Sequence, residues 1–521
     1  MRLKLYAIGL GILLMLLLVF MLDPSIWMKR ARGSGEGAER ESATLVSPAK
    51  PALPKAEKKK DSGPGGKKNF DGSLETGAGR EIPGEKLLLF RDGSAYQRFL
   101  GSAPAGVILG QIEGLRAVRV RDGDWLQSMG AGGEMTRGNN YYVQVPQVPL
   151  EVRTMGDAVY RVVGAKAMDL MGAEGVTAGW GKNVQVALLD TQLGEAETLL
   201  GAESGHGTSM KSLIAGGSGA VQGAAPGAQV TNFPVLDGEG KGNSFTLAQA
   251  IVQAVDKGAQ VINMSLGSDG DSAVVRAAVA YALSRNVALV AAAGNEAVNR
   301  VSYPAAYEGV LAVASVDGDK QQLYFSNRGS SVGVAAPGFA VVADWPGGKT
   351  VEVSGTSAST ALVSGVLAAL ISKEPGMTGT RAVELIRQYA DDTGAVGKDE
   401  ETGYGVVDLQ RVLERNQRGI IDLAVAGVKL DPAGKLTVAV QNRGTETVNS
   451  PVLEIGVGGS SRKFYLGSLA PGQSAAESVQ FDAVRARQDG GIAGHASIQA
   501  PRGADQRSGN DLWSGYFKIS K

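Results

Sequence analysis

Apolar residues between positions 155 and 415 form short continuous runs, separated by longer stretches with helical periodicity. Residues 245–257 place Leu247, Ile251 and Val255 on one face, as an amphipathic helix requires. Strands that are apolar on both faces and alternate with helices predict an α/β fold with a doubly wound parallel sheet. The other predicted elements here are strands at 184–189, 229–235, 260–264 and 287–293, and helices at 272–285 and 358–371.

Two flanking regions have a different pattern. Residues 85–150 contain three short strand-like runs and one helical run between Gly and Asp turns, which predicts a small α+β unit. Residues 418–521 contain alternating apolar positions broken by turn signals, which predicts an immunoglobulin-like β-sandwich. The core between them, residues 151–417, is the predicted α/β domain.

Near the N-terminus, after Arg2 and Lys4, residues 5–22 form an uncharged apolar stretch. As a helix it measures about 27 Å, close to the thickness of a bilayer core. Residues 1–32 are therefore a signal anchor or a cleaved signal peptide. We expect an uncleaved anchor, since no small-x-small cleavage site closes the run. Residues 33–84 are rich in Gly, Pro, Lys and Glu, which is typical of a disordered linker.

Composition narrows the function. The 521 residues include 52 Lys plus Arg and 52 Asp plus Glu, so no net charge attracts nucleic acid, and we predict no nucleic-acid partner. Cysteine is absent, which excludes disulfides, zinc–thiolate sites and a cysteine nucleophile.

The candidate chemistry centres on Ser357. It precedes the predicted helix at 358–371, where free N–H groups and the helix dipole favour negative charge. A serine so placed can attack a carbonyl and stabilise the resulting oxyanion. The alternative is that Ser354, Thr356 and Ser357 only cap the helix.

A serine nucleophile needs a base and an orienting acid. The chain has two histidines, and His206 begins a glycine-flanked helical stretch. Asp190 ends the strand at 184–189, where α/β proteins place catalytic groups, so it could orient His206. Asn295 follows the strand at 287–293 and could complete an oxyanion hole with the Ser357 N–H.

In this order, Asp190, His206, Asn295 and Ser357 resemble the catalytic residues of the subtilisin-like serine proteases, or subtilases. The resemblance covers about residues 155–415 and includes a Tyr303–Pro304 pair, for which it predicts a cis bond. The Asp190-to-His206 segment is shorter than is usual in the family. Whether the family's structural calcium site is retained there is therefore left undecided by the resemblance. The strings that carry the resemblance are Val186-Ala-Leu-Leu-Asp-Thr191, Gly205-His-Gly-Thr208, Ala292-Ala-Gly-Asn295 and Gly355-Thr-Ser-Ala-Ser359.

The resemblance implies a serine endopeptidase that cleaves polypeptides without a required cofactor. It also implies that residues 85–150 are a propeptide and that the chain is made as a zymogen; a permanent accessory domain is the alternative. A further alternative is a catalytically silent binding or adhesion protein. The residues implied to bind an extended substrate are Ser265, Leu266, Gly267, Gly240, Gly242, Ala293 and Gly294.

Maturation and location follow as predictions. Residues 139–155 are predicted to be extended, so they can enter the cleft and be cut there. Glu296 could favour a basic residue before the cut, with Arg153 one candidate, although an exposed turn carboxylate is our first interpretation. We expect a membrane-anchored or exported bacterial protein in the periplasm or outside the cell.

Overall fold

The computed structural model describes residues 46–47, 80–128, 133–155, 160–176, 178–194, 200–217, 219, 221–431, 433–501 and 504–519. The predictions for residues 5–22 and for most of the linker lie outside these ranges. Within them, one helix is both long and apolar enough to cross a membrane: α11 (Thr356–Lys373). Of its residues, 89% are buried within the folded chain, as in the core helix of a folded domain.

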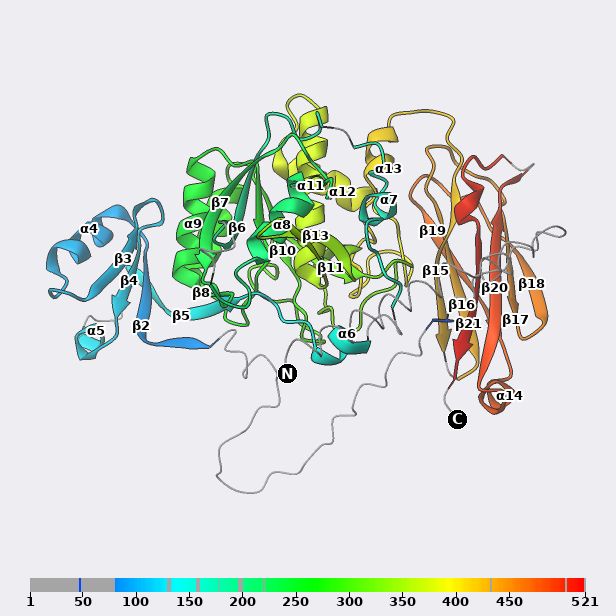
Figure 1. Cartoon of the computed structure of the whole chain (residues 1–521), viewed down its shortest axis with the longest axis horizontal. Coiled ribbons are helices and arrows are strands. Elements are labelled where there is room, and N and C mark those ends of the chain that lie inside the picture. The colour runs from blue at the N-terminus through cyan, green and yellow to red at the C-terminus, as the bar shows by residue number, and fades with distance from the viewer. Residues whose placement is uncertain are drawn as a thin grey trace, which may run out of the picture. The chain divides into compact units, whose positions relative to one another are not determined.

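A parallel sheet forms the centre of the α/β domain (Figure 1). Its strands are apolar and almost wholly buried where helices cover both faces, except β7, the last parallel strand, whose first half is partly exposed. The doubly wound α/β prediction is confirmed. In spatial order the strands are β12 (Val332–Pro337), β11 (Leu311–Val316), β10 (Ala288–Ala292), β9 (Val261–Met264), β6 (Gln185–Thr191) and β7 (Gln229–Leu236).

Successive residues of each strand point into two different cores. On β6, Leu189 packs in the core that contains α9 (Ser244–Asp256) and α10 (Ala273–Leu283). Its neighbour Leu188 packs in the core on the other face. This alternation is the period of a strand, and it fixes the register of the sheet. The helices of the second core are α7 (Ala167–Leu170), α8 (His206–Ala215), α11, α12 (Gly379–Gln388) and α13 (Leu409–Glu414).

The N-terminal unit extends the same sheet. Its antiparallel strands continue beyond β7 through the short strand β8 (Lys241–Asn243). The long strand β5 (Met135–Gln144) makes the connection, because its first half pairs with β2 and its last residues pair with β8 (Figure 1). The other elements of the unit are β2 (Glu81–Phe90), α4 (Gly93–Ser102), β3 (Ile108–Ile112), η1 (Glu113–Leu115), β4 (Ala117–Arg121) and α5 (Asp124–Ser128).

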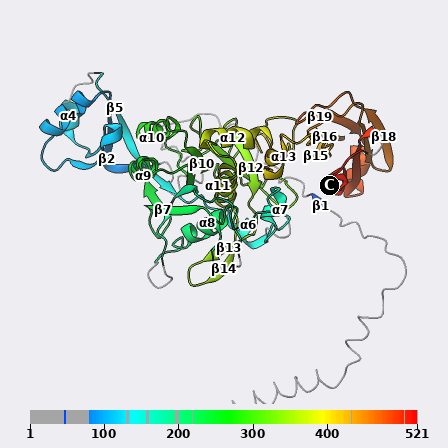
Figure 2. The same ribbon diagram turned by 90° about the horizontal axis from the view of Figure 1, so that it is seen from above.

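The C-terminal residues, joined by residues 46–47 of the predicted disordered linker, form two facing sheets around their own apolar core (Figures 1 and 2). One sheet has the order β1, β21, β20, β17, β18 and the other β15, β16, β19. Their bounds are β1 (Val46–Ser47), β15 (Leu423–Asp431), β16 (Lys435–Asn442), β17 (Val452–Val457), β18 (Ser460–Tyr465), β19 (Ser474–Gln480), β20 (Gly491–Gln499) and β21 (Leu512–Lys518), with α14 (Ala483–Gln488) and η5 (Ser508–Asn510) between strands.

One secondary-structure prediction was wrong. Residues 139–155 were expected to be extended throughout, but Leu150–Met155 form the helix α6. Pro149 stands just before this helix, where a missing N–H costs nothing because the first turn leaves its N–H groups unpaired. The remaining elements are the antiparallel pair β13 (Val341–Trp345) and β14 (Lys349–Val353).

Candidate functional site

The predicted base and its orienting acid meet at the carboxyl end of the sheet. His206 begins α8, and its Nδ1 lies 2.7 Å from Asp190 Oδ1, at the end of β6. Asp190 is fully buried and His206 is nearly so. Burial lowers the pKa of His206, but the Asp190 carboxylate raises it by a larger amount. The pKa of His206 therefore lies above the ordinary imidazole value.

A close approach between β6 and α8 holds this pair in place. The Gly207 N–H donates to Thr191 Oγ1 at 2.9 Å, and the Thr191 N–H donates to Asp190 Oδ1 at 2.7 Å. A β-carbon on Gly207 would lie 2.7 Å from the Thr191 carbonyl oxygen, so only glycine fits after His206. The second glycine of the Gly-His-Gly string is therefore required sterically.

Ser357 lies in the first turn of α11 and is buried. The residue before the helix is Gly355 with a φ of 120°, and no side chain caps the helix. Ser354 Oγ instead accepts the Ala340 N–H, and Thr356 Oγ1 donates to Asn295 Oδ1. The alternative that these residues only cap the helix is therefore wrong.

The hydroxyl of Ser357 is not hydrogen-bonded to the histidine. Ser357 Oγ donates to the Ser265 carbonyl oxygen at 3.3 Å. His206 Nε2 is buried and has no hydrogen-bond partner among the described residues. The base on α8 and the nucleophile on α11 are therefore not joined by the hydrogen bond through which the proton would pass.

Asn295 points its amide N–H at a peptide carbonyl. Its Oδ1 accepts both the N–H and the hydroxyl of Thr356 at 3.0 Å, which fixes the orientation of the amide. Its Nδ2 donates to the Pro146 carbonyl oxygen at 2.9 Å. A β-carbon on Gly355 would lie 2.6 Å from this Nδ2, so the glycine leaves room for it.

Residues 142–146 lie between the two predicted substrate-binding segments as an extended strand. Gln144 exchanges both backbone hydrogen bonds with Gly267, at 2.9 and 2.8 Å. On the other side, Val143 pairs with Gly242, and the Val145 N–H donates to the Gly240 carbonyl at 2.9 Å. The predicted residues Ser265, Leu266, Gly267, Gly240 and Gly242 therefore flank this strand.

Ala293 and Gly294 lead into Asn295 and face a polar group of side chains. The Ala293 carbonyl accepts the Ser302 N–H, and the Gly294 N–H donates to Thr356 Oγ1. Glu296 was expected to be an exposed turn carboxylate, and this was wrong: it is half-buried and accepts from Asn327 Nδ2 at 2.6 Å. Burial raises the pKa of Glu296.

A β-carbon on Gly294 would lie 2.5 Å from Glu296 Oε2. Glu296 therefore lies directly against this stretch of backbone. The side chain of Arg153, the other candidate in that interpretation, lies outside the described residues. The nearby Tyr303–Pro304 bond is cis, as predicted.

Ser265 was predicted to bind substrate, but its supporting partners Asn263 and Ser364 were not predicted. Ser265 Oγ donates to the Ser357 carbonyl, Asn263 Nδ2 donates to Ser265 Oγ, and Ser364 Oγ donates to Asn263 Oδ1. All three are buried, so this chain of bonds ties β9 to the catalytic end of α11. The polar residue at 263, inside the predicted apolar strand at 260–264, was the cue in the sequence.

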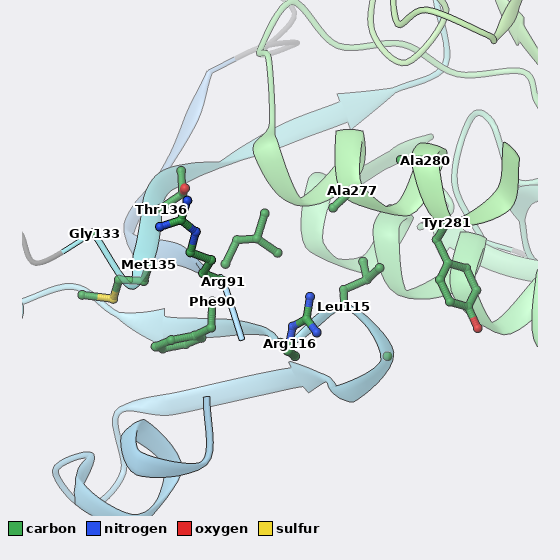
Figure 3. A pocket seen from close by; sticks show the side chains of 12 residues that line it. Phe90, Arg91, Leu115, Arg116, Gly133, Met135, Thr136, Ala277, Ala280 and Tyr281 are labelled. Atoms are coloured by element: carbon green, nitrogen blue, oxygen red, sulfur yellow. The ribbon is translucent and has the colours of Figure 1, made fainter. Parts of the chain in front are cut away.

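A cavity of about 680 Å³ lies away from these residues (Figure 3). The N-terminal unit supplies Arg91, Arg116 and Thr136 on one side, and α10 supplies Ala277 and Tyr281 on the other. None of the site residues lines it. Among the described residues, no group of three or more His, Asp or Glu side chains is placed to hold a metal ion.

Comparison with known proteins identifies the family. The Subtilase family model matches residues 194–405. The chain is 36% identical over 232 residues to the thermostable alkaline protease of Halalkalibacterium halodurans, which covers 42% of this chain and 64% of that protein, less than two thirds of its length. It is 34% identical over 247 residues to subtilisin BL of Lederbergia lenta, covering 44% of this chain and 90% of that protein.

The solved structure of the patellamide maturation protease PatA matches with a TM-score of 0.41 at 30% identity, over 45% of this chain and 97% of that one. The two sequence relatives are proteases, and the second is matched over nearly its whole length. The chain belongs to the subtilase family of subtilisin-like serine proteases, which are hydrolases that act on polypeptides.

Proposed function

We propose that the chain is a serine endopeptidase made as an autoinhibited zymogen. Ser357 Oγ attacks the substrate carbonyl carbon while its proton passes to His206 Nε2. Asp190 holds the imidazole in position and stabilises its charged form. The tetrahedral oxyanion accepts hydrogen bonds from Asn295 Nδ2 and from the Ser357 N–H.

Collapse of this intermediate breaks the C–N bond. His206 gives its proton to the leaving amine, and the acyl group remains on Ser357 as an ester. Water then attacks the ester with His206 as the base, which releases the acid and restores the serine hydroxyl. The chain itself supplies every catalytic group in these steps, so we propose that no cofactor is required.

Structural calcium binding is checked separately, by measuring the melting temperature with and without a chelator.

One observation carries the proposal: a peptide carbonyl is already bound to Asn295 Nδ2. It belongs to Pro146, in a strand that Gln144 and Gly267 join by backbone hydrogen bonds. Binding an extended chain by strand addition is how an endopeptidase grips a substrate of varied sequence. The strand here is the chain's own.

The position of this strand supports a propeptide role for residues 85–150, ahead of a protease domain at 151–417. A self-cut at the Pro146–Gln147 bond would separate the N-terminal unit from the core. We further propose that residues 5–22 anchor the precursor in a bacterial membrane, with the folded part outside the cytoplasm. Cutting at residue 146 would then release the protease from the membrane.

The test uses full-length protein and labelled denatured casein. If self-processing is slow, a trace amount of trypsin removes the N-terminal unit, and the trypsin is inhibited before casein is added. We expect wild type to hydrolyse casein and Ser357→Ala to be inactive, while both show the same circular dichroism spectrum. Casein left intact by a wild type whose N-terminal unit is gone would reject the protease and favour the silent binding protein.

The β-sandwich at residues 418–521 is proposed to remain with the protease after maturation. Gln441 Oε1 accepts the Asp392 N–H at 3.0 Å, and Arg443 Nη1 lies 3.2 Å from the buried carboxylate of Asp391. These contacts favour a β-sandwich that caps the protease domain and not one that acts as an independent binding module. Mass spectrometry of the mature protein should find the protease domain and residues 418–521 in a single chain.

A further inference from the structure

The strand between the two predicted substrate-binding segments has the backbone hydrogen bonds of an extended substrate up to residue 145. Gln144 and Gly267 exchange both of their backbone hydrogen bonds, and the Val145 N–H donates to Gly240 on the opposite side. In an antiparallel pair, the exchanging residues recur every second position. The next pair to exchange bonds is therefore Pro146 with Ser265.

That exchange cannot be completed, because proline has no N–H. The Ser265 carbonyl, which would accept the N–H of any other residue at 146, accepts the Ser357 hydroxyl instead, at 3.3 Å. His206 Nε2, to which this hydroxyl must donate for catalysis, is buried and has no hydrogen-bond partner among the described residues. The Pro146 carbonyl is nevertheless bound to Asn295 Nδ2.

A second contact holds the bond that follows Pro146. Gln147 Nε2 lies 3.3 Å from the Val145 carbonyl and 3.3 Å from Glu203 Oε1. The side chain of Gln147, after the bond, is thus tied back to the backbone of Val145, the residue that precedes Pro146. This arrangement opposes separation of the two ends.

We infer that Pro146 is a positioning residue that makes this strand an inhibitor instead of a good substrate. By withholding an N–H, it leaves the Ser265 carbonyl free to hold the Ser357 hydroxyl away from His206. A residue with an N–H at position 146 competes for that carbonyl and returns the hydroxyl to the histidine. The inference rests on the proposed protease function and adds how its own N-terminal unit controls it.

The experiment compares full-length wild type with Pro146→Ala and with the matched control Pro149→Ala. Intact-mass time courses measure cleavage between residues 146 and 147, and Ser357→Ala supplies the background. One net hydrogen bond corresponds to about a 3- to 10-fold ratio, so Pro146→Ala should be cut that much faster than wild type. Pro149→Ala should follow the wild-type rate.

Two further measurements separate the missing N–H from a change of shape. Incorporation of L-lactic acid at position 146 keeps the alanine methyl group and removes the N–H, so its cleavage should fall back to the wild-type rate. A fluorophosphonate probe should label Ser357 faster in Pro146→Ala than in wild type, because the hydroxyl then faces His206. Equal cleavage of the lactic acid and alanine forms would overturn the inference.

Failure of the inference and failure of the proposed function give different results. If trypsin-treated wild type hydrolyses casein but Pro146→Ala cuts itself no faster than wild type, the protease stands and the role of Pro146 is rejected. If no form hydrolyses casein or reacts with the probe, the proposed protease function and the role of Pro146 are both rejected.

Discussion

At the residue scale, the site depends on pairs of groups that are distant in the sequence. Asp190 and His206 are separated by 16 residues, yet their side chains form a 2.7 Å hydrogen bond because β6 ends beside the start of α8. The strand-end rule and the local strings were enough to predict this pair. The protonation state of His206 was not predictable, because it depends on how burial and the neighbouring carboxylate balance.

The pKa of His206 gives a prediction for activity against pH. Asp190 raises this pKa above the ordinary value of about 6.5, and the base must be neutral to accept a proton. Peptidase kcat/KM should therefore fall as pH drops through a pKa above 6.5. In Asp190→Asn the acid limb should move to lower pH, and kcat should drop by about 10⁴.

The check is a pH profile of kcat/KM for wild type and Asp190→Asn, measured on the released enzyme with a fluorogenic peptide. Asp169→Asn is a matched control on the outer helix α7. An unchanged acid limb in Asp190→Asn would show that another group sets the profile.

Asn295 gives a second prediction at this scale. Its Nδ2 is held toward the substrate carbonyl by two bonds from Thr356 to its Oδ1. Because the oxyanion carries full charge only near the transition state, Asn295→Ala should lower kcat by about 100- to 1,000-fold with a smaller change in KM. A variant that raised KM and kept kcat would make Asn295 a structural turn residue.

At the scale of elements, the catalytic groups depend on how closely two helices approach. Helix α8 carries His206 and helix α11 carries Ser357, and they cross at Gly365. The apolar run predicted α11 as a buried helix. The crossing point was not predictable, because a glycine inside a helical run has no sequence signal that names its neighbour.

The substitution Gly365→Ala sets two effects against each other. Alanine favours an interior helix position over glycine by about 1 kcal/mol. However, its β-carbon would lie 2.7 Å from the Ala224 side chain and 2.9 Å from the Ile214 carbonyl oxygen, and overpacking of this kind costs about 1–3 kcal/mol. The steric cost should win, so the free energy of unfolding should fall by about 1 kcal/mol or more.

The shift of α11 against α8 should also lower kcat. The control is Gly101→Ala in α4, where a β-carbon has no neighbour within 4 Å and a gain of about 0.5–1 kcal/mol is expected. Urea unfolding measures both variants. A stabilised Gly365→Ala would show that the helices move apart without cost.

At the scale of the whole molecule, a buried charge cluster joins the α/β domain to the β-sandwich. The Asp391 carboxylate is buried and lies within 3.2 Å of Lys320 and Arg411 in the first domain and of Arg443 in the second. The composition change near residue 418 predicted the two domains. The cluster was not predictable, because each charge by itself looks like an ordinary surface residue.

Arg443→Met tests whether this cluster holds the two domains together. Burial raises the pKa of Asp391, but Arg443, Lys320 and Arg411 together hold it well below its ordinary range. Removing one cation leaves the carboxylate buried with fewer partners, at a cost of about 2 kcal/mol in the free energy of unfolding. A group with a depressed pKa stabilises the fold above its ordinary pKa of about 3.9 and loses this contribution as pH falls further. The difference in the free energy of unfolding between wild type and variant should therefore be full above about pH 4 and narrow below it.

Arg485→Met is the matched control, since Arg485 pairs with Asp489 at 3.6 Å on the exposed surface of the same β-sandwich, where such pairs contribute about 0–1 kcal/mol. Equal unfolding curves for both variants in urea at pH 7 would mean that the β-sandwich is attached by its apolar contacts and backbone hydrogen bonds instead.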